Sequence, residues 1–336
     1  MVTNTKEIEE MIKAGQLTAI TDENYYDAEI NKTYMSFHTW LSLHGCDGVI
    51  RCEAKSIAEM NGEYIDEEAD NKALQIGSYV DAKLAGDENE FAKFVKENPD
   101  IFTYEKSVDM ESIENHYPEW LTKNGTLKSD MSMKKIEATE PTLIKYTPKG
   151  LKSDFVMAEK MVQRCEKDPL FMGFMAGEKQ RIFTADLWGV PFKGKIDSYK
   201  PYGKPIIVDL KTSRDLHKLF FKKDIGHIDF ISYYGYIYQL ALYRELVYRN
   251  TGEMCECFVC AVSKGKHPEI KVISIDEISL NSAIEEIEKS IKYTGLVDVW
   301  QGKVKPMRCN SPECPYCVDT EVLTSVVDYR DIISVV

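Results

Sequence analysis

Apolar and polar side chains alternate most regularly between residues 183 and 212 of the 336-residue chain. Two short β-type runs lie there, Phe192 to Tyr199 and Pro205 to Lys211, and the residues between them include Pro201 and Gly203, which favour a turn. Successive side chains of a strand point to opposite faces, so each run has one largely apolar face. The pattern therefore predicts a β-hairpin that packs on a core through that face.

Helical periodicity dominates the rest of the chain. Apolar residues recur at three- and four-residue intervals in several stretches, and two further runs are typical of strands. The helices are expected at residues 6–14, 34–63, 66–84, 87–104, 155–175, 231–248 and 280–300, and the strands at residues 254–263 and 269–275. We expect an α/β fold in which a mixed central sheet is flanked by helices, with an N-terminal helical region.

Residues 105–150 break this regularity, because they are polar, rich in Lys and only weakly periodic. Such a stretch is too long for an ordinary connection, and it predicts an insertion, a mobile lid or a contact for a partner. The sequence favours none of the three. The organisation expected is a helical part over residues 1–104, the polar stretch, a core over residues 151–303 and a cysteine-containing segment over residues 304–336.

The composition is that of a globular protein, with 43% hydrophobic and 29% charged residues. No run approaches the roughly 18 to 20 apolar residues of a membrane span. The polar, acidic N-terminus lacks the pattern of a secretory or transit peptide. We therefore expect a cytoplasmic protein that contacts no membrane. In that compartment the nine cysteines are expected as thiols or metal ligands rather than disulfides.

Charge is distributed unevenly along the chain. The net charge of −13 argues against indiscriminate coating of nucleic acid, but residues 189–223 carry nine Lys or Arg against three Asp, a local charge of +6. A basic strip suits a protein that guides a phosphate backbone, and Lys193, Lys195 and Arg214 are its candidate DNA contacts. A solvated basic face without a partner is the alternative.

The predicted hairpin also gathers acidic groups. Strand alternation places Asp197 opposite the apolar face of the first run, and it places Asp209 and Lys211 on the corresponding face of the second. The two carboxylates and the backbone carbonyl of Leu210 are suitable ligands for Mg²⁺ or Mn²⁺, and Lys211 could orient a water or stabilise developing charge. This arrangement suits metal-assisted cleavage of a phosphodiester. An ordinary charged surface hairpin is the alternative, since Asp-x-Lys alone is a weak signal.

One polar residue stands out in the aromatic helix expected at residues 231–248. Gln239 and Tyr243 are four residues apart and therefore lie on one face of that helix. A place in the core explains most of the tyrosines. Gln239 differs, because an amide among apolar neighbours needs a polar partner. It is therefore a candidate for more than packing.

Three cysteines fall within nine residues near the C-terminus, at Cys309, Cys314 and Cys317. Short spacing and intervening prolines favour a loop that wraps a metal or a cluster. Three thiolates are one short of a full set, and Cys46 or Cys52 is available as the fourth. A cysteine-rich loop without metal is the alternative.

Taken together, Asp197, the run Asp209-Leu210-Lys211 and the pair Gln239 and Tyr243 resemble the PD-(D/E)xK nuclease superfamily, in its RecB-like branch. Four segments are similar in particular to the phage and prophage exonuclease VIII group of the RecE type. These are residues 77–81, 178–180, 194–197 and 207–212. The resemblance covers residues 34–102 and 151–317, and it implies a restriction-endonuclease-like nuclease core.

The resemblance also assigns roles to residues. It implies that Asp197 and Asp209 are metal ligands and that Lys211 is the catalytic lysine, while Gln239 and Tyr243 position DNA or support the site. The branch usually has a further metal ligand, His or Glu, on a helix before the sheet, and that place is taken here by Asp81. Some RecB-like nucleases hold an iron–sulfur cluster with one cysteine before the core and three after it. The cysteines with that distribution are Cys46, Cys309, Cys314 and Cys317, so a 4Fe-4S cluster is implied, with zinc or no metal as alternatives.

The activity implied by the resemblance is a metal-dependent DNA exonuclease. It would degrade one strand of duplex DNA from the 5′ end and leave single strands for phage-type homologous recombination. A ring-forming homo-oligomer and a single-strand annealing protein are the implied partners. A structure-specific or CRISPR-adaptation-type endonuclease with an iron–sulfur cluster is one alternative. A non-cleaving DNA-binding module on the same fold is another, although such a module has no need of the complete Asp, Asp and Lys set.

Overall fold

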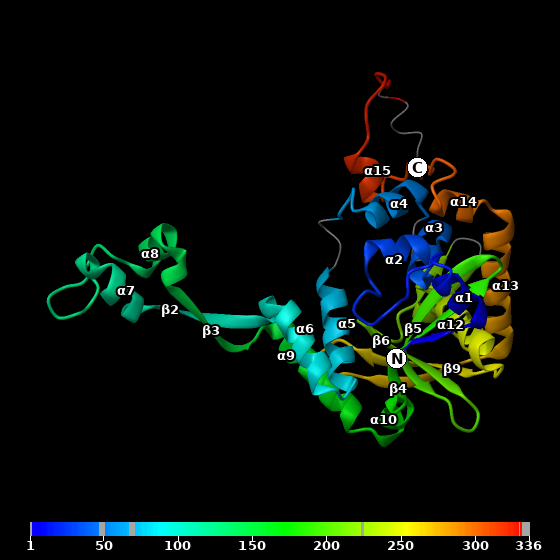
Figure 1. The fold of residues 1–336 in the computed structure, drawn as a ribbon, viewed down its shortest axis with the longest axis horizontal. Coiled ribbons are helices and arrows are strands. Elements are labelled where there is room, and N and C mark those ends of the chain that lie inside the picture. Colours follow the sequence, from blue (N-terminus) through cyan, green and yellow to red (C-terminus); the bar gives the residue numbers. More distant parts are fainter. Residues whose placement is uncertain (1, 47–50, 67–70, 223–224, 329, 331–336) are drawn as a thin grey trace. The chain divides into compact units, whose positions relative to one another are not determined.

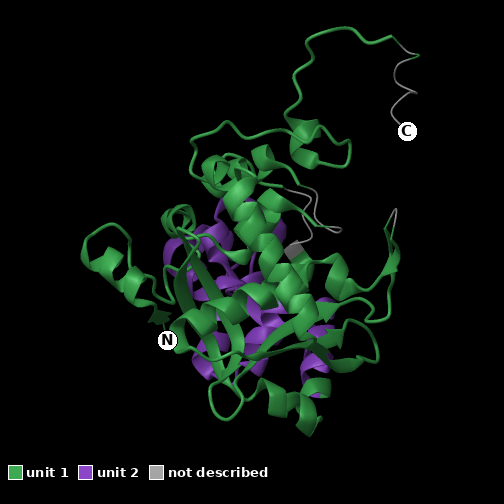
Figure 2. Cartoon of the chain, turned by 90° about the vertical axis from the view of Figure 1, so that its right-hand side faces the viewer, with its two compact units in different colours: residues 1–74, 164–336 green, residues 75–163 purple. Residues whose placement is uncertain are grey.

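The structure is a computed structural model that describes residues 2–46, 51–66, 71–222, 225–328 and 330. Positions 47–50 and 67–70, which belong to two of the expected helices, lie outside the described residues, as does Lys223 of the basic strip. The chain divides into two compact units (Figure 2). Unit 1 comprises Met1–Leu74 and Arg164–Val336, and unit 2 comprises Gln75–Gln163.

Unit 1 is built on a six-stranded mixed sheet (Figure 1). In order across the sheet, its strands are β1 (Val2–Asn4), β4 (Glu178–Leu187), β5 (Val190–Lys200), β6 (Ile206–Ser213), β9 (Glu256–Ser263) and β10 (Ile270–Ile275). Neighbours pair antiparallel except β1 with β4 and β6 with β9, which are parallel. The α/β class with a mixed sheet is confirmed. The sequence did not predict β1, because three residues are too few to show alternation.

The helices of unit 1 include those that periodicity predicted, often shorter or divided, and two, over residues 28–33 and 315–319, that it did not predict. They are α1 (Lys6–Lys13), α2 (Ala28–Thr33), α3 (Phe37–His44), α4 (Glu53–Asn61), α10 (Pro169–Met175), α11 (Phe230–Tyr233), α12 (Tyr236–Thr251), α13 (Glu277–Tyr293), α14 (Leu296–Trp300) and α15 (Pro315–Asp319). The stretch at residues 280–300 is divided at Gly295, whose φ of 76° is a conformation that glycine adopts easily. No helix in the described ranges is long and apolar enough to cross a membrane.

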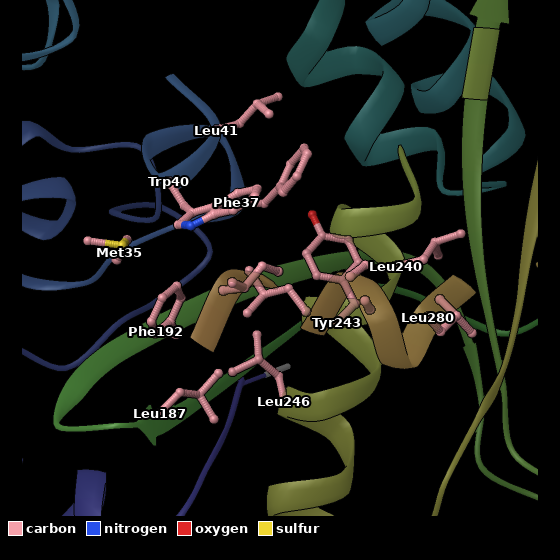
Figure 3. Close-up of a cluster of buried hydrophobic side chains, with 14 of the residues drawn as sticks. Met35, Phe37, Trp40, Leu41, Leu187, Phe192, Leu240, Tyr243, Leu246 and Leu280 are labelled. Atoms are coloured by element: carbon pink, nitrogen blue, oxygen red, sulfur yellow. The ribbon is translucent and has the colours of Figure 1, made fainter. Parts of the chain in front are cut away.

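Helix α12 lies in the main hydrophobic core (Figure 3). It packs against β4 and β5, and Gly194 of β5 permits this close approach. A Cβ at Gly194 would lie 2.8 Å from Leu246 Cδ1 and 2.9 Å from the ring of Tyr243. Trp40 of α3 belongs to the same core, and its indole N–H donates to Ser290 Oγ over 2.7 Å. This packing holds Tyr243 and its neighbours on α12 against the sheet.

Unit 2 contains the polar stretch at residues 105–150. Its elements are α5 (Asn71–Leu84), α6 (Glu88–Glu97), β2 (Phe102–Val108), α7 (Met110–His116), α8 (Met133–Thr139), β3 (Ile144–Leu151) and α9 (Ser153–Glu166), and the boundary between the units falls within α5 and α9. The antiparallel β2–β3 ladder leads to α7 and α8 (Figure 1). A small apolar cluster there comprises Ile113, Met131, Ile136, Leu143 and Ile144. The polar stretch therefore has its own small core, and its role as insertion, lid or partner contact stays a prediction.

Candidate active site

The β5–β6 hairpin brings together the acidic residues that alternation placed on one face. Its ladder pairs Ser198 with Val208, so one further step along both strands places Asp197 of β5 across from Asp209 of β6. The backbone N–H of Leu210 donates to Asp197 Oδ2 over 2.8 Å. That bond fixes the Asp197 carboxylate at the edge where β5 and β6 diverge.

Asp209 and Lys211 form a buried ion pair on β6. Only 2% of Asp209 is exposed, and its Oδ2 lies 2.7 Å from Lys211 Nζ. Burial raises the pKa of Asp209 to about 6; the charge of Lys211 opposes this shift and that of Asp197 adds to it. For Lys211, burial lowers the pKa, but the two carboxylates outweigh it and hold the pKa above its ordinary value. Lys211 is therefore a cation beside Asp209, and the carboxyl of Asp209 holds its proton more tightly than an ordinary aspartate does.

The Asp209 carboxylate has the features of a cation ligand. Its Oδ2 is buried and, apart from the close Lys211 ammonium, receives no aligned hydrogen bond in the described structure. A buried carboxylate oxygen needs a positively charged or hydrogen-bonding partner, and the Lys211 ammonium supplies one here. The Asp197 and Asp209 pair therefore fits a hard divalent metal, which prefers oxygen ligands.

Gln239 and Tyr243 of α12 form a buried polar pair behind the hairpin. Gln239 Nε2 donates to the Tyr243 hydroxyl over 3.0 Å, which supplies the partner that the sequence required. The Gln239 Oε1 is buried and accepts no hydrogen bond from the described residues. Burial first, and then Tyr25 and the charges of Asp209 and Asp197, raise the pKa of Tyr243 well above its ordinary value. Tyr243 is therefore a neutral hydroxyl close to both carboxylates.

Residues 36–320 match a family described as PDDEXK-like domain of unknown function (DUF3799). The chain belongs to this PDDEXK-like family. It is also similar to a protein from Eubacterium rectale, described as a "Putative exonuclease", with 32% sequence identity and a TM-score of 0.73 over 95% of this chain and 100% of that one. A second solved structure, SSO0001, aligns at 15% identity over 62% of this chain and 80% of that one, but its TM-score of 0.23 carries no argument. No curated protein matched.

The PDDEXK-like family and the similar solved structure support a nuclease. Nucleases with this domain generally use divalent metals, which agrees with the chemistry of the Asp197 and Asp209 pair. The narrower resemblance to RecE-type exonucleases stays a prediction.

Three residues near the PDDEXK-like acid pair were not predicted as site residues. Gln180 of β4 donates from Nε2 to Asp197 Oδ1 over 3.3 Å, and its φ of 49° is rare for a residue other than glycine. The β4–β5 register places Gln180 directly across from Asp197, between the pairs Lys179 with Ser198 and Arg181 with Ile196. The Tyr236 ring of α12 faces Lys211 Nζ at 4.7 Å. The resemblance included residues 178–180 as a segment but gave Gln180 no role, because its contact with Asp197 depends on the pairing of β4 with β5.

His38 of α3 is the third of these residues. Packing around its ring and the positive charge of Lys211 lower the pKa of His38 to about 4. His38 is therefore neutral at physiological pH, although the residue as a whole is exposed to solvent. The sequence gave no signal for it, because α3 and β6 are far apart along the chain.

Part of the basic strip expected to bind DNA is committed to internal contacts. Lys193 is 1% exposed, and its Nζ donates to the Tyr25 carbonyl and to Asn31 Oδ1, the latter over 2.7 Å. Its assignment as a DNA contact is therefore wrong: the two acceptors draw the side chain inward. Lys195 lies 3.8 Å from Asp22 in an ion pair, and Arg214 is exposed. Both stay predicted DNA contacts of this PDDEXK-like domain.

Asp81 lies on α5 in unit 2, whereas Asp197 and Asp209 belong to unit 1. It is partly buried. Its role as a further metal ligand, and that of the Leu210 carbonyl, stay predictions for this PDDEXK-like chain.

The cysteine set differs from the one that the resemblance implied. Cys52, rather than Cys46, joins Cys309, Cys314 and Cys317, and the four sulfurs all lie within 4.8 Å of one another. Cys46 instead donates its thiol to the Tyr233 carbonyl over 3.3 Å. The fourth member is separated from the others by most of the chain, so the sequence could offer Cys46 and Cys52 only as equals.

Proposed function

We propose that the protein is a Mg²⁺-dependent deoxyribonuclease, with Mn²⁺ as a substitute, and that it degrades duplex DNA from its ends. The observation that carries the proposal is the buried Asp209 carboxylate, which is ion-paired with Lys211 and lies beside Asp197. The hairpin supplies the oxygen ligands and the cation that hydrolysis of a phosphodiester requires. The similar Eubacterium rectale protein, described as a "Putative exonuclease", supports the preference for DNA ends.

The carboxylates and Lys211 have separate tasks in this proposal. Asp197 and Asp209 would hold the metal, with the Leu210 carbonyl and Asp81 as further candidate ligands. When bound, the metal supplies a Lewis acid and lowers the pKa of a coordinated water. The carboxylates of Asp209 and Asp197 hold the pKa of Lys211 above its ordinary value, so we propose Lys211 as a cation in the site and not as a general base. It therefore neutralises charge on the phosphate oxygens as the bond breaks, or orients the attacking water.

The residues around the hairpin position these groups. Asp197 receives hydrogen bonds from the Leu210 N–H and from Gln180, so its oxygens cannot rotate freely. Tyr243 is held by Gln239, and the pair limits water behind the carboxylates because both residues are buried. Arg214 and Lys195 would contact the DNA backbone. A fixed, partly dry site favours catalysis, since its dipoles need little reorganisation during the reaction.

The wider role is proposed from the RecE-type resemblance. The enzyme would degrade the strand that ends 5′ and leave single-stranded DNA for phage-type recombination. A single-strand annealing protein would receive that product, and a ring of identical subunits would keep the enzyme on its duplex.

The proposal is tested by incubating the purified protein with linear duplex DNA, labelled separately at each 5′ and 3′ end, with and without Mg²⁺. A covalently closed circle of the same sequence serves as the control. We expect loss of the linear DNA only with Mg²⁺, early release of the 5′ label and an intact circle. Cleavage of the circle would instead indicate an endonuclease. Binding of DNA without cleavage in either Mg²⁺ or Mn²⁺ would identify a non-cleaving module.

A further inference from the structure

Four thiols converge at a place separate from the catalytic hairpin. Cys52 precedes α4, while Cys309, Cys314 and Cys317 belong to the C-terminal segment. The Cys52 and Cys317 sulfurs are 3.7 Å apart, as are those of Cys309 and Cys317. A disulfide requires about 2.0 Å, so these are free thiols.

The spacing of the four sulfurs distinguishes a single ion from a cluster. In a tetrahedral Zn²⁺ site with Zn–S bonds of about 2.3 Å, the sulfurs lie about 3.8 Å from one another. In a 4Fe-4S cluster each cysteine binds a different iron at a corner of a cube, which places the cysteine sulfurs roughly 6 Å apart. The distances of 3.7 Å, and the limit of 4.8 Å for the whole group, fit the first geometry and not the second.

We propose that Cys52, Cys309, Cys314 and Cys317 bind one structural Zn²⁺ ion in place of the iron–sulfur cluster that the resemblance implied. Four protein ligands complete a tetrahedron and leave no position for a substrate, which is typical of a structural site and not of a catalytic one. The ion would therefore act on the fold and not on the phosphodiester. This inference does not depend on the proposed nuclease activity.

The surroundings of the thiols suit metal-bound thiolates. Cys52 is the N-cap of the nine-residue helix α4, where the helix dipole favours negative charge. The backbone N–H of Ser311 donates to the Cys309 sulfur over 3.5 Å. Arg308 donates to the Cys317 carbonyl over 2.8 Å, which brings a positive charge to a site with four thiolates. Bonds of this kind orient ligands and stabilise their charged form.

The proposed zinc would fasten the C-terminal segment to α4 (Figure 1). The two already exchange backbone and side-chain bonds, with Ala54 N–H donating to the Met307 carbonyl and Met307 N–H donating to Glu53 Oε2, both over 3.0 Å. The apolar cluster here consists only of Cys52, Ala54, Cys314 and Cys317 with two partly buried neighbours. A core this small provides little hydrophobic stabilisation, so a metal would supply much of the stability of the contact.

The test begins with the metal content of the full-length protein, purified without chelator or added metal. We expect about one Zn²⁺ per chain and no iron or acid-labile sulfide. Replacing zinc with Co²⁺ should give the intense visible spectrum of a tetrahedral tetrathiolate site. Iron with inorganic sulfide, or a protein that binds neither Zn²⁺ nor Co²⁺, would overturn the proposal.

Two variants locate the site. Loss of a hydrogen bond to a metal ligand weakens metal binding roughly 10- to 100-fold, and Cys52→Ser should weaken Zn²⁺ binding by more than that. The variant should also have a lower Tm. Cys46→Ser is the matched control, because its thiol lies outside the group, and it should retain the zinc. The opposite pattern would overturn the ligand set. If Cys52→Ser fails to fold, the Co²⁺ spectrum of the wild type still decides between four thiolates and fewer.

Discussion

The catalytic hairpin and the cysteine group are both suited to a cation, but by opposite means. The hairpin offers hard oxygen ligands from adjacent strands that pack on a large core. The fold therefore forms this site without needing a bound metal. The cysteine group joins soft ligands from the two ends of the chain over a very small apolar cluster. Stability is therefore expected to depend on the cysteine metal and cleavage on the hairpin metal.

The same contrast explains what the sequence could predict. Asp197, Asp209 and Lys211 fall on two neighbouring strands, where alternation alone determines the face of each side chain. Gln180 faces Asp197 across the β4–β5 pairing, and His38 comes from a distant helix whose place near Lys211 no local pattern reveals. Helix positions were predicted from periodicity, but their ends and divisions depend on residues such as Gly295.

Tertiary contacts also decided two features that the sequence left open or misassigned. The resemblance implied Cys46 as the fourth ligand, but the fold places Cys52 with the other three thiols. Lys193 has the charge of a DNA contact, yet acceptors on Tyr25 and Asn31 draw it into the interior. Charge along a sequence predicts neither burial nor partners that come from distant segments.

The largest expected effect is the loss of DNA cleavage when the charged residues of the hairpin are substituted. Asp209→Asn removes a metal ligand, and Lys211→Ala removes the only cation paired with it in the described structure. We expect each to lower the rate of DNA cleavage by about a thousand-fold or more, equivalent to about 4 kcal/mol in activation free energy. Single-turnover rates on linear duplex DNA measure this, with circular dichroism to establish folding. Near-wild-type rates in a folded variant would remove the site assignment.

Gly194→Ala tests how the core supports the site. The new Cβ would lie under 3.0 Å from Leu246 and Tyr243, so α12 must shift or the variant must lose about 1–3 kcal/mol in free energy of unfolding. Thermal unfolding measures the effect. Gly265→Ala is the matched control in unit 1, because its Cβ would meet nothing within 4 Å. Equal Tm changes in both variants would contradict the packing described here.

Lys193→Met separates burial from DNA binding. It leaves the Tyr25 and Asn31 acceptors without their donor, and we expect about 1–3 kcal/mol less stability with little change in the salt dependence of DNA binding. Arg214→Ala should have the opposite pattern. The slope of log DNA affinity against log salt concentration should fall by about one, while Tm stays unchanged. Urea unfolding and DNA titrations at several salt concentrations distinguish them. A weakened salt dependence in Lys193→Met would restore its role as a DNA contact.

Cleavage should depend on pH through Asp209. Its carboxyl must lose a proton to bind metal, and its pKa is about 6, so at low Mg²⁺ the rate should fall about tenfold for each pH unit below that value. Because metal and proton compete for one carboxylate, higher Mg²⁺ should move the midpoint to lower pH. Rates measured from pH 5 to 8 at two Mg²⁺ concentrations test this. If the pH midpoint of the cleavage rate does not move with the Mg²⁺ concentration, the titrating group is not Asp209.

Gln180→Ala should have the smallest effect. It removes one hydrogen bond to Asp197 but leaves the bond from the Leu210 N–H. We expect a loss of about tenfold or less in cleavage, equivalent to about 1 kcal/mol. Gln180→Glu is the informative partner, because a like charge beside Asp197 should change metal affinity more than stability. Identical Mg²⁺ dependence in both variants and the wild type would show that Gln180 does not position the carboxylate.

The central claim is that the hairpin carboxylates hold the catalytic metal independently of the cysteine group. The most direct measurement is Mn²⁺ binding at neutral pH, followed by electron paramagnetic resonance, in the wild type, Asp209→Asn and Cys52→Ser. We predict that the wild type and folded Cys52→Ser bind Mn²⁺ with similar affinity, while Asp209→Asn loses this binding. Wild-type Mn²⁺ affinity in Asp209→Asn would contradict the account.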